Sequence, residues 1–216
     1  MTARIDLQGL AGLLAARADQ AAGQGRRVVV ALAGAPGSGK STVAEALADR
    51  LNAGQGGRAA VLPMDGFHYD DLYLVPAGLR PRKGAPDTFD VGGLYHVLQR
   101  LRARDEAFVA VPVFDRSLEI ARAGARLIPD TVPVLIVEGN YLLLDRDPWR
   151  RLRPLFDLTV MVDVPEPVLR QRLTARWQHY ALSPEQITEK LEENDLPNGR
   201  LIREESAAAD YSLRNG

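Results

Sequence analysis

Five short apolar runs are spaced along the chain, and each has the length of a β-strand. The first, residues 27–33, reads RVVVALA and is rich in β-branched residues without polar alternation. Such a run is typical of a strand that is buried on both faces of a parallel sheet. Similar runs follow at residues 59–64, 109–114, 134–137 and 158–164, of which 109–114 is a short possible strand and 134–137 a strong one.

Helical patterns separate most of these runs. Four leucines between residues 7 and 14 have helical spacing, and residues 40–51 and 92–104 continue with the same period. Strands that alternate with helices predict an α/β fold, a three-layer α/β/α sandwich with a mostly parallel sheet. Ligands bind such sheets at the carboxyl ends of the strands, so functional residues are expected just after each strand.

A long segment of irregular pattern, residues 66–91, joins the second and third runs. It is rich in Pro, Gly, Asp and Arg, and it is longer than a connector in a compact domain needs to be. Its aromatic residues Phe67, Tyr69, Tyr73 and Phe89 favour an ordered loop that faces a substrate over a disordered one.

The composition fits one domain. The 216 residues, 46% of them hydrophobic, suffice for one core with a small lid but not for two ordinary domains. With 27 basic and 28 acidic residues the net charge is −1, so no global charge favours nucleic acid or an anionic membrane as a partner. The absence of cysteine fits a cytoplasmic location, and we expect neither a signal peptide nor a membrane-spanning segment.

The most specific motif follows the first strand. Residues 34–41 read GAPGSGKS and match G-x-x-x-x-G-K-[ST] between a predicted strand and a predicted helix. Backbone N–H groups of such a loop face phosphate oxygens, and the N-terminus of the helix adds its positive dipole end. Lys40 is expected to bridge the β- and γ-phosphates of ATP, and Ser41 to ligate Mg²⁺. The alternative is a glycine turn with a chance lysine, which this context disfavours. The predicted nucleotide site comprises Gly34, Ala35, Pro36, Gly37, Ser38, Gly39, Lys40, Ser41 and Thr42.

Two acidic residues end other strands. Asp65 follows the second run beside the predicted phosphate site, where a carboxylate accepts the proton of an attacking hydroxyl or holds magnesium through water. Glu138 closes the fourth run in the manner of a Walker B carboxylate and is expected to support the Mg²⁺ shell. The alternatives are a turn aspartate next to Gly66 and a glutamate that merely faces solvent.

The histidines are less informative. His68 lies in the long segment and is expected to touch substrate, whereas His96 is expected on the surface of a helix. Neither has a second ligand at metal spacing, so no metal is assigned to them.

Taken together, these motifs resemble the phosphoribulokinase, uridine kinase and pantothenate kinase group of P-loop kinases, and most of all its nucleoside/nucleotide kinase-like (fructose-type sugar kinase) subgroup. Besides the glycine-rich motif, the resemblance rests on MDGFHY at 64–69, RKGAPDTFD at 82–90, VPVFDR at 111–116 and VLIVEGNY at 134–141. It implies a P-loop NTPase fold with Asp65 as general base, and an acceptor pocket bordered by parts of these motifs. The predicted acceptor residues are Asp65, His68, Tyr69, Arg82, Lys83, Asp87, Phe89, Asp115 and Arg116.

The resemblance also implies a small helical lid that carries arginines, for which residues 170–182 are the candidate. Arg172 and Arg176 share a helical face there by their four-residue spacing. A guanidinium binds phosphate oxygens at two points and stays charged. Because 24 of the 27 basic residues are arginine, a solvated surface is the alternative. Residues 194–200, NDLPNGR, are expected to form a loop near the lid or the adenine.

The sequence thus predicts an ATP-dependent kinase that transfers the γ-phosphoryl group to a hydroxyl of a small metabolite, such as a nucleoside, a sugar or a pantothenate-like compound. The predicted catalytic residues are Asp65, Lys40, Glu138, Arg172 and Arg176. The alternatives are a nucleotide-switched, GTPase-like binding module and an ATP-binding regulator. Residues 90–93, DVGG, match the D-x-x-G element of GTPases, but the chain has no N-K-x-D element that would read guanine. The identity of the acceptor and the oligomeric state, a homodimer included, stay open.

Overall fold

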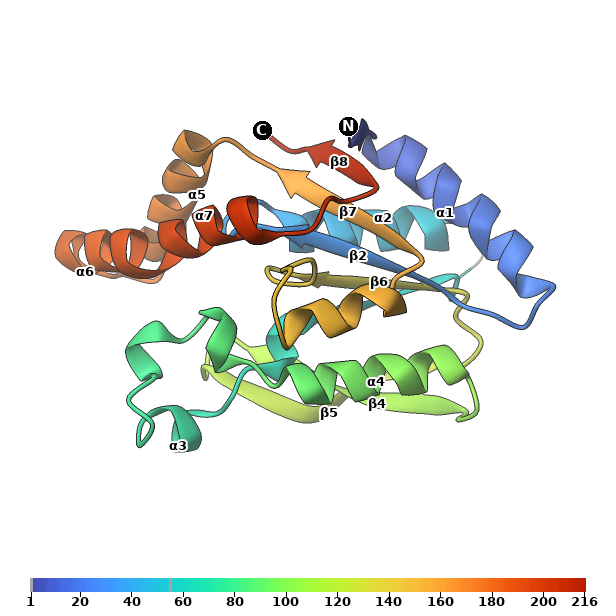
Figure 1. The fold of residues 1–216 in the computed structure, drawn as a ribbon, viewed down its shortest axis with the longest axis horizontal. Helices are drawn as coiled ribbons and strands as arrows, with labels where there is room; N and C mark the ends of the chain where they lie inside the picture. The colour runs from blue at the N-terminus through green and yellow to red at the C-terminus, as the bar shows by residue number, and fades with distance from the viewer. Residues whose placement is uncertain (1, 55) are drawn as a thin grey trace.

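The computed structural model describes residues 2–54 and 56–216, and its central element is a six-stranded sheet (Figure 1). The order of its strands is β1-β8-β7-β2-β6-β3, and every pair is parallel, as predicted for the main sheet. The strands are β1 (Ala3–Arg4), β2 (Val28–Gly34), β3 (Ala59–Pro63), β6 (Val134–Gly139), β7 (Leu158–Asp163) and β8 (Tyr211–Arg214).

Strand β2 is buried on both faces, because all seven of its residues are apolar or glycine. Side chains alternate along a strand, so Val28, Val30 and Leu32 face one helical layer, while the residues between them face the other. The first layer consists of α1 (Leu7–Ala22) and α2 (Lys40–Asn52), and the second contains α4 (Val91–Ala103), the 3-10 helix Trp149–Leu155 and α7 (Leu196–Glu205). The predicted three-layer arrangement is therefore confirmed.

The apolar run at 109–114 is not part of this sheet. It belongs to β4 (Phe108–Asp115), which pairs antiparallel with β5 (Ile120–Pro129) in a separate hairpin. No strand was predicted for β5, because IARAGARLIP is mostly exposed and lacks a continuous apolar pattern. The hairpin packs on the 3-10 helix Met64–Phe67, where a side chain at Gly66 would overlap the carbonyl oxygen of Pro112.

The segment 66–91 is ordered, as its aromatic residues predict. It contains the short helix α3 (Asp71–Leu74) and two 3-10 turns, Arg80–Arg82 and Pro86–Thr88. Phe67 and Phe89 are buried and anchor the segment to the core, whereas Tyr73 is 54% exposed. The middle of the segment is held as well, because Leu74 and Ala85 are buried.

A helical end follows β7, with α5 (Glu166–His179), α6 (Pro184–Glu189) and a π-helical turn, Lys190–Asp195, that leads into α7. The loop predicted for residues 194–200 is wrong: these residues are helical, and Pro197 lies in the first turn of α7, where a missing N–H is tolerated. In Figure 1, α5 and α6 lie on the same side of the molecule as α3. Among the described residues, no helix is long and apolar enough to span a membrane.

Candidate active site

The glycine-rich motif connects β2 to α2 and forms a tight phosphate loop. Gly37 and Gly39 have φ values of 78° and 79°, a left-handed conformation that glycine adopts without strain. The carbonyl oxygen of Ser38 accepts hydrogen bonds from Asn215 Nδ2 at 2.8 Å and from Arg172 Nη1 at 3.4 Å. The loop is thus held from the C-terminal end of the sheet and from α5, and α2 begins at Lys40.

Three strand ends bring Lys40, Asp65 and Glu138 to one edge of the sheet. Glu138 pairs with Leu32 of β2 on one side and with Pro63 of β3 on the other. It therefore lies between the strand that precedes the phosphate loop and the strand that precedes Asp65. Glu138 is only 5% exposed, so the solvent-facing alternative is wrong.

The charges of Lys40, Glu138 and Asp65 shift one another's pKa values. Burial lowers the pKa of Lys40, while the carboxylates of Glu138 and Asp65 oppose that shift. Burial raises the pKa of Glu138, and Lys40 opposes the increase. The edge of the sheet is therefore a desolvated place where charges act strongly on one another.

Asp65 lies in the 3-10 helix after β3, and its carboxylate faces Arg116 from the end of β4. Arg116 Nη2 donates to Asp65 Oδ2 at 2.5 Å. Burial alone would raise the pKa of Asp65, but Arg116, His68 and Lys40 together hold the pKa below its ordinary value. Asp65 is therefore a carboxylate at neutral pH, as a proton acceptor must be.

His68 is packed between two aromatic rings. Its ring centroid lies 4.0 Å from that of Phe89 and 4.7 Å from that of Phe114. Burial lowers the pKa of His68, which favours the neutral form at pH 7. Because Nδ1 lies 2.8 Å from the carbonyl oxygen of Asp65, this nitrogen carries the proton, and Nε2 is left as a hydrogen-bond acceptor.

One cleft collects most of these side chains. The predicted site residues that line it are Pro36, Lys40, Ser41, Asp65, His68, Lys83, Phe89, Arg116 and Arg176. Ten further residues line the cleft that were not among the predicted site residues, namely Arg80, Gly84, Phe114, Glu119, Asn140, Trp177, Lys190, Asn194, Asp195 and Asn198. Five of them lie in segments that were expected at the acceptor pocket or the lid, which are residues 82–90, 170–182 and 194–200. Arg172, one turn before Arg176 on α5, contacts the phosphate loop instead of lining the cleft.

Four predicted acceptor residues lie outside the cleft. Tyr69 packs against Tyr73, with ring centroids 5.0 Å apart, while Arg82 and Asp87 are exposed. Asp115 accepts hydrogen bonds from Arg122 and from residues of the hairpin turn, so its carboxylate stabilises the hairpin. The acceptor pocket is therefore smaller than the family resemblance implies, because these four residues do not line it.

Some of the missed residues had a signal in the sequence. Asn140 follows Glu138 at the strand end, where functional residues are expected, and its Oδ1 is buried without a hydrogen-bond partner among the described residues. Asn194 was placed in a turn, yet it donates from Nδ2 to the carbonyl oxygen of Lys83 at 3.1 Å. Trp177 donates from Nε1 to Asp195 Oδ2 at 2.7 Å, a contact that no local pattern indicates.

The D-x-x-G match at 90–93 has a structural role. Asp90 is the N-cap of α4, and its Oδ1 accepts a hydrogen bond from the N–H of Gly93 at 2.8 Å. This element therefore begins a helix, and it does not support the GTPase-like alternative. His96 lies exposed on the same helix, as predicted.

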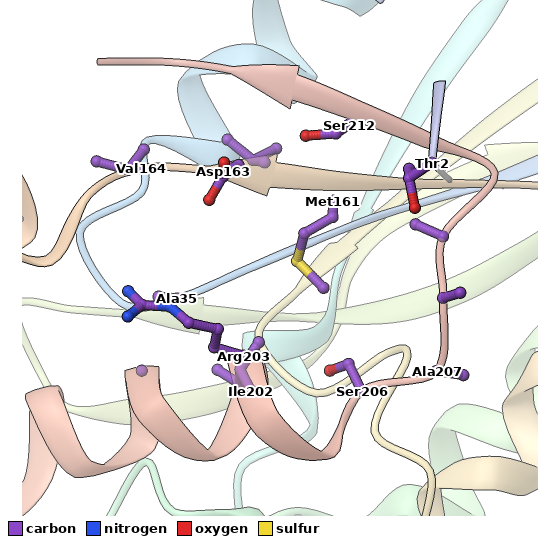
Figure 2. Close-up of a pocket in the computed structure, with 14 residues that line it drawn as sticks. Thr2, Ala35, Met161, Asp163, Val164, Ile202, Arg203, Ser206, Ala207 and Ser212 are labelled. Carbon is purple, nitrogen blue, oxygen red and sulfur yellow. The ribbon is translucent and has the colours of Figure 1, made fainter. Parts of the chain in front are cut away.

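A second cavity lies behind the phosphate loop, on the face of the sheet that α7 covers (Figure 2). Its volume is about 290 Å³, and its lining includes Met161, Arg203, Ser206 and Ser212. Ala35 is the only predicted site residue that faces this cavity among the described residues. The cavity is therefore separate from the cleft that contains Lys40 and Asp65.

Known proteins resemble this chain in sequence and structure. Residues 29–193 match the model of the Phosphoribulokinase / Uridine kinase family. A Schizosaccharomyces pombe protein, provisionally named a uridine kinase, is 31% identical over 196 residues, which cover 88% of this chain and 83% of that protein. A pantothenate kinase of Limosilactobacillus reuteri is 30% identical over 137 residues, which cover 62% of this chain and 44% of that enzyme. A solved structure from Silicibacter sp. TM1040, provisionally named a fructose transport system kinase, is 42% identical and superposes with a TM-score of 0.81, covering 92% of this chain and 98% of that one.

These relatives share one type of reaction but are named for different acceptors. The matched residues include the phosphate loop, Asp65, Glu138 and the arginines of α5. The chain therefore belongs to the phosphoribulokinase / uridine kinase family, and it is an ATP-dependent phosphotransferase that uses a hydroxyl group as acceptor.

Proposed function

We propose that the protein transfers the γ-phosphoryl group of ATP to a hydroxyl of a small metabolite that binds against the 66–91 segment. The observation that carries this proposal is the position of Asp65. Its carboxylate lines the same cleft as Lys40 and Ser41, although the residues come from different strand ends. A nucleotide-switched module needs one carboxylate beside the phosphate loop to hold Mg²⁺, whereas this chain has Asp65 in the cleft in addition to Glu138 at the strand end.

In this proposal Lys40 and the N–H groups of residues 34–42 hold the phosphates of ATP. Arg172 and Arg176 belong to a lid of about residues 170–182 on a single kinase domain, and they neutralise charge on the transferred group. Arg172 already contacts the phosphate loop, and Arg176 lines the cleft. These positions favour a phosphate-binding role over a solvated face.

Asp65 is the general base. The hydroxyl oxygen of the acceptor forms a bond to the γ-phosphorus as the bond from that phosphorus to the β,γ-bridging oxygen breaks, and the hydroxyl proton passes to Asp65. ADP leaves with the electron pair of the broken bond. Because Arg116 holds Asp65 ionised, the base is available at neutral pH without a further proton acceptor.

We also propose that ATP binds with Mg²⁺. Ser41 and the buried Glu138 face the same small hollow between α2 and β3, and a hydroxyl and a carboxylate are oxygen donors that suit this ion. When bound, Mg²⁺ would supply positive charge to the phosphates. Ser41 would ligate it directly, and Glu138 would orient its water.

Exclusion of water is the remaining task, because an exposed phosphoryl group would be hydrolysed. Trp177 and Lys190 from the helical end face the cleft, and the Lys190 ammonium lies 5.8 Å from the Trp177 ring centroid. We propose that this end closes over the bound substrates. ATP as a substrate and the balanced charge of the chain agree with a cytoplasmic enzyme that works without nucleic acid or membrane.

The test is acceptor-dependent ADP formation. Purified protein with ATP and Mg²⁺ is assayed against nucleosides, sugars, hydroxy acids, sugar phosphates and pantothenate, alongside Asp65→Asn and the exposed control Asp87→Asn. We expect stimulation by at least one class, its loss in Asp65→Asn and its retention in Asp87→Asn. ADP formation that no acceptor stimulates, or stimulation that survives in Asp65→Asn, would contradict the proposal.

A further inference from the structure

The cleft carries an excess of positive charge, and not all of its cations lie at the phosphate end. Six cationic side chains line it, against three carboxylates. The cations are Lys40, Arg80, Lys83, Arg116, Arg176 and Lys190, and the carboxylates are Asp65, Glu119 and Asp195. The question is which of these cations serve the acceptor.

The cations fall into two groups. Arg176 is the cation that acts most on the pKa of Lys40, and it lies at the phosphate end. Lys83 acts instead on the pKa of His68, which is packed on the rings of Phe89 and Phe114. Arg116 acts on both Lys40 and His68, and it therefore lies between the two ends.

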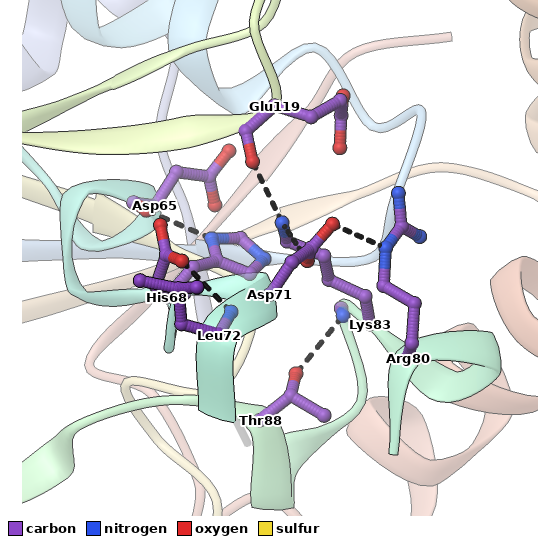
Figure 3. Close-up of polar contacts among 10 residues, drawn as sticks. Asp65, His68, Asp71, Leu72, Arg80, Lys83, Thr88 and Glu119 are labelled. Atoms are coloured by element: carbon purple, nitrogen blue, oxygen red, sulfur yellow. Dashed lines mark hydrogen bonds and ion pairs between the residues drawn. The ribbon is translucent and has the colours of Figure 1, made fainter. Parts of the chain in front are cut away.

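Lys83 and Arg80 share one carboxylate (Figure 3). Lys83 Nζ donates to Asp71 Oδ1 at 2.8 Å, and Arg80 Nε donates to Asp71 Oδ2 at 2.6 Å. Lys83 Nζ also donates to the carbonyl oxygen of Glu119 at 2.7 Å, although its side chain is only 5% exposed. Two cations face one carboxylate, so the three side chains together carry a net positive charge, and the Lys83 end of this cluster is shielded from solvent while Arg80 is 38% exposed.

The backbone that carries Lys83 is fixed by distant elements. Tyr141 donates from its hydroxyl to the carbonyl oxygen of Gly84 at 2.7 Å, and Asn194 donates to that of Lys83 at 3.1 Å. The N–H of Gly84 donates to Thr88 Oγ1 at 2.9 Å. A flexible, solvated lysine would need no such support, so the ammonium is held at a defined point of the cleft.

The neighbouring guanidinium groups keep donors available. Arg80 uses Nε for Asp71, and Arg116 uses Nη2 for Asp65. Their other N–H groups make no hydrogen bond within residues 2–54 and 56–216, and both side chains line the cleft. The cations of Lys83 and Arg116 also lie 5.5 and 6.0 Å from the ring centroid of Phe114, so one aromatic surface orders them.

We infer that the acceptor carries an anionic group, a carboxylate or a phosphate, in addition to the hydroxyl that reacts, and that this group binds among Arg80, Lys83 and Arg116. The inference rests on the proposed kinase function and narrows its acceptor to hydroxy acids or sugar phosphates. The anion supplies the charge that Asp71 alone does not balance. It also competes with Asp65 for Arg116, so that binding of the correct acceptor loosens the ion pair on the base.

The experiment compares acceptors that differ only in the anionic group. The pairs are glycerate with glycerol, pantothenate with its alcohol, and fructose 6-phosphate with fructose, each assayed by ADP release at saturating ATP. We expect the anionic member of the accepted pair to have a kcat/KM about 10- to 100-fold higher, the range of charge-assisted hydrogen bonds. The first two pairs report a carboxylate, and the third reports a phosphate.

Variants locate the anion subsite. Arg80→Gln and Lys83→Met are expected to raise the KM of the anionic acceptor about tenfold or more, with a smaller change in kcat and no change in the KM of ATP. Arg80→Lys restores part of the affinity, because it restores the charge. Arg82→Gln, in the same turn but exposed and outside the cleft, serves as the matched control and is expected to behave as wild type.

The outcomes separate the inference from the function on which it rests. Efficient phosphorylation of neutral acceptors, with no preference for the anionic member of a pair, overturns the inference and leaves the kinase function in place. So does an unchanged preference in both Arg80→Gln and Lys83→Met. If no compound of either kind stimulates ADP formation, the proposed function fails and the inference falls with it. Thermal melts of each variant distinguish loss of binding from loss of folding.

Discussion

The phosphate loop and the 66–91 segment line the same cleft, but they are built in opposite ways. The loop is eight consecutive residues, and its shape follows from glycine conformations between a buried strand and a helix. The acceptor side depends more on contacts between residues far apart in the sequence, although Arg80 and Lys83 also bind Asp71 within their own segment. Lys83 and Asn194 are 111 positions apart, and Asp65 and Arg116 are 51 positions apart.

This difference indicates a division of labour. A locally encoded loop binds a substrate that many proteins share, and its shape follows from its own sequence although Asn215 and Arg172 also contact it. An acceptor pocket assembled from a hairpin, a strand end and the helical end can change with any of these elements. We therefore expect variants of the loop to damage every reaction of ATP, and variants of the 66–91 side to damage only the reaction with the acceptor.

The largest selective effect is expected for Asp65→Asn. Replacing the base removes the proton acceptor while keeping the size of the side chain, so acceptor-dependent kcat should fall about 10²- to 10⁴-fold. The KM of ATP and the slow hydrolysis of ATP without acceptor should change little. Steady-state ADP release with and without acceptor measures both. An equal loss of the two rates would contradict the division between the phosphate loop and the acceptor side, because Asp65 would then act on ATP itself.

Lys40→Met should affect both reactions. The variant loses a half-buried positive charge at the phosphates, and removal of one such group costs about 10²- to 10³-fold in rate. ATP affinity should also fall. The fluorescence of Trp177, which lines the cleft, can report it, because Trp149 is buried in the core. Arg50→Met on the same helix is the control, and a variant that keeps wild-type ATP affinity would contradict the assigned role of Lys40.

Much of the nucleotide half was predictable from sequence. The apolar β2, the glycine motif and the start of α2 are adjacent, so local physics and spacing suffice. Asp65 and Glu138 were predictable for a related reason: carboxyl ends of parallel strands converge at one edge, and the pairing of Glu138 with Pro63 agrees. Their catalytic roles remain predictions.

The acceptor half was predicted less well, for physical reasons. Strand β5 is exposed and carries no apolar pattern, so the hairpin that presents Arg116 was not recognised. Asn194 was assigned to a turn because Asn, Pro and Gly favour turns, whereas tertiary packing keeps the segment helical. Arg80 lies just outside the RKGAPDTFD motif, and only the fold brings it to Asp71.

Gly66→Ala tests whether the hairpin positions the acceptor side. The added methyl group would overlap the carbonyl oxygen of Pro112, so β4 must move, and the free energy of unfolding should fall by about 1–3 kcal/mol. Acceptor-dependent turnover should fall with it, since Arg116 directly follows β4, while ATP affinity should persist. Gly12→Ala on α1 is the matched control. It meets no neighbouring atom and should stabilise the helix by about 0.5–1 kcal/mol. Equal stability of the two variants in urea denaturation would show that the hairpin is not packed on Gly66.

The smallest effect concerns Asp71, whose charge orders the 66–91 segment. Hydrogen bonds from Lys83 and then Arg80 hold the pKa of Asp71 below its ordinary value of 3.8. The unfolded chain therefore takes up a proton at higher pH than the folded one, so this contribution to stability is complete above about pH 5 and is lost as pH falls through the lowered pKa. Because the Asp71 side chain is 37% exposed, the contribution should not exceed about 1 kcal/mol. Urea denaturation of wild type and Asp71→Asn should give a difference that is constant between pH 6 and 8 and narrows below about pH 4. A difference that persists undiminished at pH 3 would mean that the Asp71 contacts with Lys83 and Arg80 do not depend on its charge. Asp71 could then not be counted as the negative charge that partly balances these two cations.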